Sequence, residues 1–257
     1  MTPTEFALAG LAAAGAGAVN ALAGGGTLIS FPALLAMGVP PIAANVTNAV
    51  ALCPGYFGAT LAQAAHLRGQ EARLRWCIPA AVAGGLLGGV ILLRTHERTF
   101  QQLVPYMLIV ASVLLALQER VRAAVLRRLA RAEGEPHSPR HSQLTAAIPV
   151  GAAAIYGGFF SAGMSILVLA MLGVTVTDSF TRLNALKQVL AFSINVAAAV
   201  FFLFSGQVLW LLAAVMAVGA VVGGVIGGKL AGRIPPAALR WLVVVVGVAL
   251  ATYYWMR

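Results

Sequence analysis

The sequence is poor in charged residues, which make up 9% of its 257 positions, whereas 60% of the positions are hydrophobic. A soluble domain carries about a quarter charged residues. The few charges also stand in short islands between apolar runs, and these runs are long enough to cross a hydrocarbon core of about 30 Å. These features exclude a water-soluble protein and predict an all-α polytopic membrane protein that lies in the lipid bilayer.

Motifs that carry chemistry are also missing. The two cysteines, Cys53 and Cys77, form no CxxC pair, so no disulfide framework or thiolate metal site is predicted. The sequence has no HExxH, GxSxG or P-loop motif, which argues against a membrane protease and an ATP-driven pump. His137 and His141 flank Pro139 in a charged loop, which is a poor metal site. We therefore predict no enzyme, no metal and no cofactor.

The net charge of +10 would suit a nucleic-acid-binding protein, but the basic residues flank apolar runs. This is the pattern of cytoplasmic loops in membrane proteins, so nucleic acid is not an expected partner. The apolar N-terminus carries Glu5 and no basic residue, which a secretory signal peptide would need. We expect this first segment to remain in the membrane.

Eight apolar segments are separated into two sets of four by one long polar stretch, 119–143. The segments lie at about 4–37, 44–64, 76–93, 101–118, 144–172, 181–204, 208–229 and 238–256. The polar stretch holds six arginines and reads as a basic cytoplasmic linker. We predict a first transmembrane repeat over 1–118, the linker over 119–143 and a second repeat over 144–257.

Short motifs recur in both halves in the same order. The glycine pairs of 84–89 return 139 residues later at 223–228, and Gly69-Gln70 returns as Gly206-Gln207. Asn48-Ala49 in the first half likewise returns as Asn184-Ala185 in the second half. One such echo could come from the glycine and alanine content, but several in order indicate duplication. The paired glycines also match the small-residue pattern of close helix packing.

The first segment of each half is long and interrupted by glycine. Residues 4–37 are too many for one span and too few for two, and Gly24–Gly26 break the run. In the second half Gly157-Gly158 and Gly163 break 144–172. Freed backbone is tolerated at membrane depth only inside protein or beside a cavity. Both segments therefore predict re-entrant hairpins or discontinuous helices, although the glycines could serve only close packing.

The distribution of basic residues supports re-entrant first segments. If those segments do not cross, each half has three spans and the halves are inverted relative to each other. One side of the membrane then holds 14 of the 17 Lys and Arg residues, in loops 65–75, 119–143, 173–187 and 229–240. This split obeys the positive-inside rule and predicts a cell inner-membrane protein with both termini periplasmic. Inverted repeats with broken helices are a recurring transporter design.

A half-helix that starts at a glycine break directs its free N–H groups and positive dipole end forward. Two such tips would form a donor-rich pocket. The candidate substrate-binding residues at the tips are Asn20, Gly25, Gly26 and Thr27 in the first half, and Ser161, Gly163 and Ser165 in the second.

Polar residues inside the second and sixth segments are further candidates for the same site. Asn184, Lys187 and Gln188 share one helical face, and a cation at membrane depth usually faces a polar cavity. Arg182 and Lys187 could instead reach lipid headgroups, and the amides could simply join helices. The complete set of candidates from these segments is Asn45, Asn48, Arg182, Asn184, Lys187 and Gln188.

All seven acidic residues lie outside the expected middle of the membrane. A cation carrier or proton relay would need a carboxylate there, so the substrate is expected to be a small anion. The sequence names no coupling residue.

The motifs resemble the sulfite exporter TauE/SafE family over nearly the whole chain, with the central linker apart. The matching runs are Asn20–Thr27, Phe31-Pro32, Gly38–Pro41, Thr47-Asn48, Gly84–Gly89, Gly151–Ser165 and Gly227–Pro236. The second half departs from the pattern, because Ser161–Ser165 replaces a fuller glycine cluster. The resemblance implies an inner-membrane permease for sulfur-containing anions, such as sulfite or a sulfonate like sulfoacetate.

Together these features predict a secondary transporter that binds such an anion at the midplane and works by alternating access. Export is the expected direction. A passive anion channel, or an uptake permease for another oxyanion or a carboxylate, remains the alternative. The expected partners are the small anion and the lipid bilayer, and a homo-oligomeric state is left open. A non-transporting scaffold fits the interrupted helices poorly.

Overall fold

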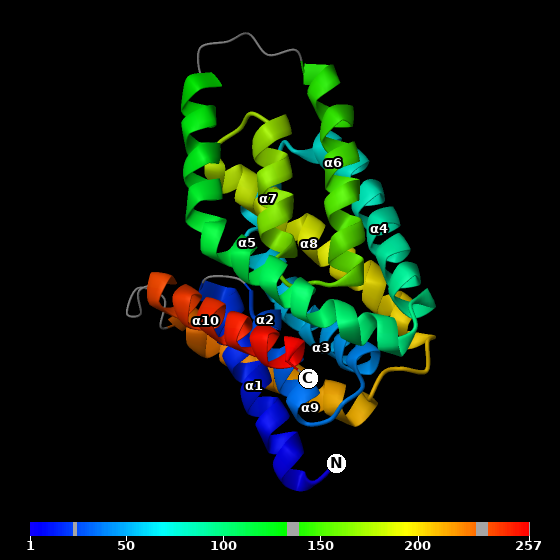
Figure 1. Ribbon diagram of the computed structural model, residues 1–257. Coiled ribbons are helices and arrows are strands. Elements are labelled where there is room, and N and C mark those ends of the chain that lie inside the picture. The colour runs from blue at the N-terminus through cyan, green and yellow to red at the C-terminus, as the bar shows by residue number, and fades with distance from the viewer. Residues whose placement is uncertain (23–24, 133–138, 230–235, 257) are drawn as a thin grey trace.

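The computed structural model describes residues 1–22, 25–132, 139–229 and 236–256. These residues form ten α-helices and one short 3-10 helix, with no strand among them (Figure 1). The helices are α1 (Pro3–Leu22), α2 (Thr27–Ala36), α3 (Pro41–Ala62), η1 (Ala64–Leu67), α4 (Glu71–Arg94), α5 (Glu97–Ala132), α6 (Pro139–Phe159), α7 (Met164–Thr175), α8 (Phe180–Leu203), α9 (Trp210–Lys229) and α10 (Pro236–Trp255).

The predicted all-α, polytopic class is confirmed. Within the described ranges, five helices are long and apolar enough to cross a membrane, namely α4, α5, α8, α9 and α10. The sixth expected span, 44–64, is α3, which has 22 residues but carries Asn45, Thr47 and Asn48 in its first half. Those polar side chains lower its hydropathy, and all three are buried inside the protein.

Both predicted interruptions are present. In the first half α1 ends at Leu22 and α2 starts at Thr27, with Gly25 at φ +86°. In the second half α6 ends at Phe159 and α7 starts after Gly163, which has φ +79°. Such positive φ values are available to glycine without strain. With 10 and 12 residues, α2 and α7 are too short to span a bilayer.

One detail of the second interruption was predicted wrongly. Gly157 and Gly158 belong to α6, and the chain leaves the helix only after Phe159. Glycine occurs within a helix where a neighbouring helix comes too close for a side chain. A Cβ on Gly158 would overlap the carbonyl of Gly85 on α4. Gly158 therefore serves the approach of two helices, not the break.

The predicted linker 119–143 is mostly helical. α5 continues to Ala132 and α6 begins at Pro139. Within this stretch, only residues 133–138 lie outside the described part of the chain. Val121, Val125 and Leu129 are spaced four apart and form an apolar stripe on the extension of α5. Arg128 completes the contact with α7 by donating to the Gly173 carbonyl at 2.8 Å. This stripe keeps the extension folded against α7.

The two sequence halves interleave. α1 packs along α9, and α4 packs along α6, so each long contact joins helices of different halves. Both contacts follow the glycine pairs: Gly219, Gly223 and Gly227 of α9 meet α1, and Gly84 and Gly88 of α4 meet α6. Small residues let helix backbones approach closely. In lipid, where no hydrophobic effect acts between helices, the van der Waals contacts made in this way hold the helices together. The predicted packing role of these glycines agrees with this geometry.

The α4–α6 contact gives a stability prediction. A Cβ on Gly88 would overlap the Ile155 carbonyl oxygen, whereas a Cβ on Gly151 would stay 3.7 Å from its nearest neighbour, on Ala80. We expect Gly88→Ala to destabilise the fold by about 1–3 kcal/mol through overpacking. The measurement is the thermal unfolding midpoint in detergent, and Gly151→Ala, on the same interface, should leave it unchanged. Equal effects of the two substitutions would contradict this packing.

The helices form two groups that mix the halves. In the orientation of Figure 1, the lower group contains α1, α2, α3, α9 and α10, and the upper group contains α4, α6, α7 and α8. α3 packs against α8 where the groups meet, and α5 runs along α10 and then turns upward beside α7 (Figure 1). Helix pairs repeat between the halves, since α1–α2 corresponds to α6–α7 and α3–α9 to α8–α4. The repeat boundaries and the inverted orientation stay predictions.

Candidate functional site

A cavity of about 630 Å³ lies between the lower and upper groups. Both helix breaks line it, together with the second half of α3, the starts of α7 and α8, and parts of α1 and α9. Its apolar wall includes Leu52, Leu169 and Val225. A volume of this size falls within the range of sites for small ligands.

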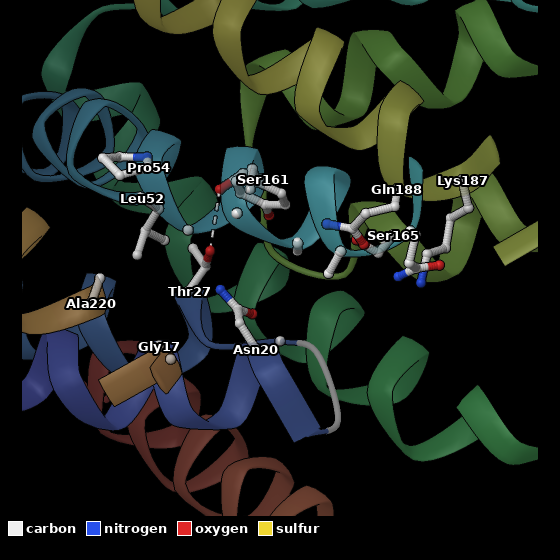
Figure 2. Close-up of a pocket in the computed structure, with 18 of the residues that line it drawn as sticks. Gly17, Asn20, Thr27, Leu52, Pro54, Ser161, Ser165, Lys187, Gln188 and Ala220 are labelled. Atoms are coloured by element: carbon white, nitrogen blue, oxygen red, sulfur yellow. Dashed lines mark hydrogen bonds between the residues drawn. The ribbon is translucent and has the colours of Figure 1, made fainter. Parts of the chain in front are cut away.

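The cavity gathers most of the residues predicted to bind substrate. Thr27, Ser161, Ser165, Lys187 and Gln188 come from four different elements and lie along one cavity (Figure 2). Nine of the thirteen candidates line it: Asn20, Gly25, Thr27, Ser161, Gly163, Ser165, Asn184, Lys187 and Gln188. The other four, Gly26, Asn45, Asn48 and Arg182, are not among the lining residues. The binding role of all thirteen stays a prediction.

The two breaks touch each other inside the cavity. The hydroxyls of Thr27 and Ser161 are 3.3 Å apart, share a hydrogen bond and are buried (Figure 2). Asn20 fixes the first break by accepting from the Gly26 N–H at 2.8 Å. Tyr156 fixes the second by donating to the Ala162 carbonyl at 2.8 Å. The contact brings the starts of α2 and α7 together, as the sequence predicted for the two tips.

α5 supports both breaks from behind. A Cβ on Gly25 would lie 3.1 Å from Leu115, and one on Gly163 would lie 3.0 Å from Leu114. Both leucines come from the same turn of α5, so this helix holds the two breaks at a common depth. One turn further, Gln118 lines the cavity, and its buried Oε1 has no hydrogen-bond partner among the described residues.

Lys187 is part of a hydrogen-bonded chain at the cavity wall. Its Nζ donates to Asn184 Oδ1 at 2.8 Å, and Asn184 Nδ2 donates to Gln63 Oε1 at 2.8 Å. Gln63 follows α3, so the chain crosses from the lower to the upper group. Among the described residues that line the cavity, Lys187 carries the positive charge and none is acidic. The cavity therefore offers a cation and several donors to a negatively charged ligand.

Arg182 lies in an ion cluster instead of the cavity. Asp178 pairs with Arg182 at 2.9 Å and also with Arg73, and Arg182 donates to the Arg68 carbonyl at 2.9 Å. Burial acts to raise the pKa of Asp178, but hydrogen bonds from Arg73 and Arg182 outweigh it and hold that pKa below its ordinary value. The cluster ties the loop before α4 to the loop before α8. Arg182 is therefore not at the cavity, and the alternative contact with lipid headgroups stays a prediction.

Two other candidates are buried in α3 beyond the cavity. Asn45 donates to the Phe159 carbonyl at 2.8 Å, so it joins α3 to the end of α6. This is the helix-joining role that the sequence left open. Asn48 is fully buried, and within the described part of the chain neither its Nδ2 nor its Oδ1 has a hydrogen-bond partner.

The sequence interpretation missed Gln63, Tyr56 and Gln118 as cavity residues. Gln63 and Gln118 each follow an apolar run, where a polar residue reads as the start of a loop. A single glutamine that belongs to no motif does not predict a binding site. The available signal was their place at the ends of segments that flank the basic loops.

The comparison with known families decides the assignment. The model of the family described as sulfite exporter TauE/SafE matches residues 9–254. This chain belongs to the TauE/SafE family. The resemblance seen in the sequence motifs is thereby confirmed, and the match extends across both helix breaks and both glycine-paired contacts.

Several curated proteins are similar to this TauE/SafE chain. A "Probable membrane transporter protein ORF9" from Sinorhizobium sp is 28% identical over 244 residues, which cover 92% of this chain and 87% of the relative. A "Probable membrane transporter protein" from Haemophilus influenzae is 28% identical over 211 residues, covering 79% and 76%. YfcA of Escherichia coli K12, described in the same words, is 27% identical over 210 residues, covering 79% and 72%. No solved structure matches the chain.

The family and these relatives, together with the five apolar helices, support a multi-pass membrane transporter. Their descriptions name transport proteins.

Proposed function

We propose that this TauE/SafE protein is a secondary carrier for a small sulfur-containing anion, such as sulfite or a sulfonate like sulfoacetate. The observation that carries the proposal is the composition of the cavity. Lys187 and the hydroxyls of Thr27 and Ser161 line it, and no described lining residue is acidic. The family name adds the chemistry, since sulfite and sulfonates present several oxygens on a compact anionic centre.

Binding would use the Lys187 ammonium together with the hydroxyl donors at the two helix breaks. Lys187 supplies charge, and its bond to Asn184 orients the ammonium along the cavity wall. The hydroxyls at the starts of α2 and α7 can turn to donate, and the helix dipoles add partial positive charge there. The apolar wall at Leu169 and Val225 leaves room for a short carbon chain. A sulfonate with a small organic group satisfies all of these features.

The position of the cavity indicates which side it serves. Gln63, Gln118, Asn184 and Val225 line it. They stand where α3, α5, α8 and α9 approach the four loops rich in Lys and Arg. By the positive-inside rule we propose that those loops are cytoplasmic and that both termini lie in the periplasm, at a cell inner membrane. We propose that the cavity is the cytoplasm-facing form of the site and that export loads it from there.

Alternating access would then move the lower group against the upper group. Each group contains helices of both halves, so the moving bodies are not the two halves of the sequence. The α3–α8 contact is where the groups meet, and the cavity lies beside it. The Gln63–Asn184–Lys187 chain crosses this contact and would change as the groups move.

The test combines binding and flux for the purified protein. A ligand that binds the folded state raises its unfolding temperature, so a thermal-shift panel of sulfite, thiosulfate, sulfate, sulfoacetate, taurine and carboxylates ranks the anions. We expect sulfite or a sulfonate to give the largest shift. The best ligand should then show saturable uptake and counterflow in proteoliposomes. Flux without saturation or counterflow would indicate a channel, and a shift with carboxylates alone would reject the sulfur-anion class.

A further inference from the structure

Asn48 is the least satisfied polar side chain beside the cavity. It is 0% exposed, and both its Nδ2 and its Oδ1 lack hydrogen-bond partners among the residues that the structure describes. An amide buried without hydrogen bonds is unfavourable, because water would satisfy both of its polar groups. The neighbouring buried amides do not share this condition. Asn45 donates to the Phe159 carbonyl, and Asn195 donates to the Ala49 carbonyl at 3.0 Å and to Cys53 Sγ at 3.1 Å.

The register of α3 aligns Asn48 with the cavity. Leu52, Gly55 and Ala59 line the cavity and lie four, seven and eleven residues after Asn48. These spacings place all four on one helical face. Asn48 is therefore one turn, about 6 Å, beyond Leu52 on the line that the cavity follows. The cavity approaches the basic loops at Gln63, and Asn48 lies beyond the opposite end of the cavity.

The start of α3 lies beyond Asn48, on the side away from the basic loops. The start of α3 is held by Glu97, whose Oε1 accepts from the Ile42 N–H at 2.9 Å. Thr47, next to Asn48, accepts from the Leu209 N–H at 3.1 Å at the start of α9. Asn48 thus lies between the inner end of the cavity, at Leu52, and the loops at the opposite ends of the helices.

We propose that Asn48 is a second contact for the transported oxyanion, made when the cavity closes toward the basic loops and opens past Leu52. The inference rests on the proposed carrier function. In that conformation the amide N–H groups donate to the anion oxygens, and Oδ1 accepts from water that accompanies the anion. Asn48 serves passage and release, whereas Lys187 serves binding in the form described here. A polar group that is unpaired in one conformation favours the conformation that pairs it.

Replacement by leucine tests this assignment, because leucine has nearly the shape of asparagine and needs no partners. We expect Asn48→Leu to unfold at the wild-type temperature or above it. Its affinity for the anion in the thermal-shift assay should stay within about two-fold of wild type. Its transport rate in proteoliposomes should fall at least ten-fold, about 1.4 kcal/mol of activation free energy. A structural amide would not separate transport from stability in this way.

Asn195→Leu is the matched control, since Asn195 is also buried but its Nδ2 donates two hydrogen bonds. We expect it to lower the unfolding temperature. If Asn48→Leu lowers that temperature as much as Asn195→Leu does, or transports at the wild-type rate, the proposal is overturned. Wild-type protein in the same liposomes separates the two ideas. If it moves no sulfur anion, the carrier proposal fails; if it does and Asn48→Leu matches it, only the role of Asn48 fails.

Discussion

Lys187→Gln should abolish most of the anion affinity of this protein. Lys187 is the cation among the described residues that line the cavity. A hydrogen bond to a charged group contributes about 1.5–3 kcal/mol, so its loss should weaken binding about 10- to 150-fold. Glutamine keeps a polar chain of similar length that can still reach Asn184. The measurement is the dissociation constant of the ligand ranked first in the thermal-shift panel.

Arg182→Gln is the matched control for Lys187→Gln. Arg182 is on the same helix, five residues earlier, but its guanidinium pairs with Asp178 and donates to the Arg68 carbonyl. We expect this variant to lower the unfolding temperature and to keep the wild-type affinity. Lys187→Gln with unchanged affinity would show that the ammonium does not bind the anion. Equal losses of affinity in both variants would indicate a general electrostatic effect instead of a local contact.

Gly26→Ala should disable the first helix break. A Cβ at this position would overlap the Ala16 carbonyl oxygen and lie 2.9 Å from Asn20 Cγ. The start of α2 would have to move away from α1, which breaks the bond from Gly26 N–H to Asn20 and displaces Thr27 from Ser161. Overpacking of this kind destabilises by about 1–3 kcal/mol. We expect a lower unfolding temperature and at least a ten-fold loss of transport by the folded protein in proteoliposomes.

Gly15→Ala controls for the added methyl group. Gly15 also belongs to α1 and faces α2, but a Cβ there would stay 4.0 Å from Ile29, an ordinary contact. Alanine also favours the helix by up to about 1 kcal/mol over glycine. This variant should therefore unfold at or above the wild-type temperature and transport normally. Full transport by Gly26→Ala would show that the geometry of the first break is not needed for function.

Much of this protein could be predicted from the pattern of its residues. The length of the apolar runs specifies membrane helices, because the hydrocarbon thickness sets how many residues a span needs. The glycine breaks predicted both interrupted helices, since free backbone groups in a bilayer require a sheltered site. Lys187, Asn184 and Gln188 could be assigned to one face by helical spacing alone, and all three line the cavity.

Other features depend on how distant segments meet. The pairing of α1 with α9 and of α4 with α6 joins residues about 70 to 210 positions apart, and glycine pairs by themselves do not name their partners. For the same reason Gly158 was assigned to a break when its role is to approach Gly85. Gln63 and Gln118 line the cavity only because the end of α3 and the middle of α5 lie beside it.

Local periodicity and hydropathy thus determined the class of this protein, its helices and the candidate cation, because these depend on each segment and on the solvent around it. Tertiary packing alone decided which candidates face the cavity and which join helices, as Asn45 does. It also left Asn48 without a hydrogen-bond partner among the described residues. The physical reason is that a hydrogen bond or a close helix contact needs two surfaces. A single segment specifies only one of them.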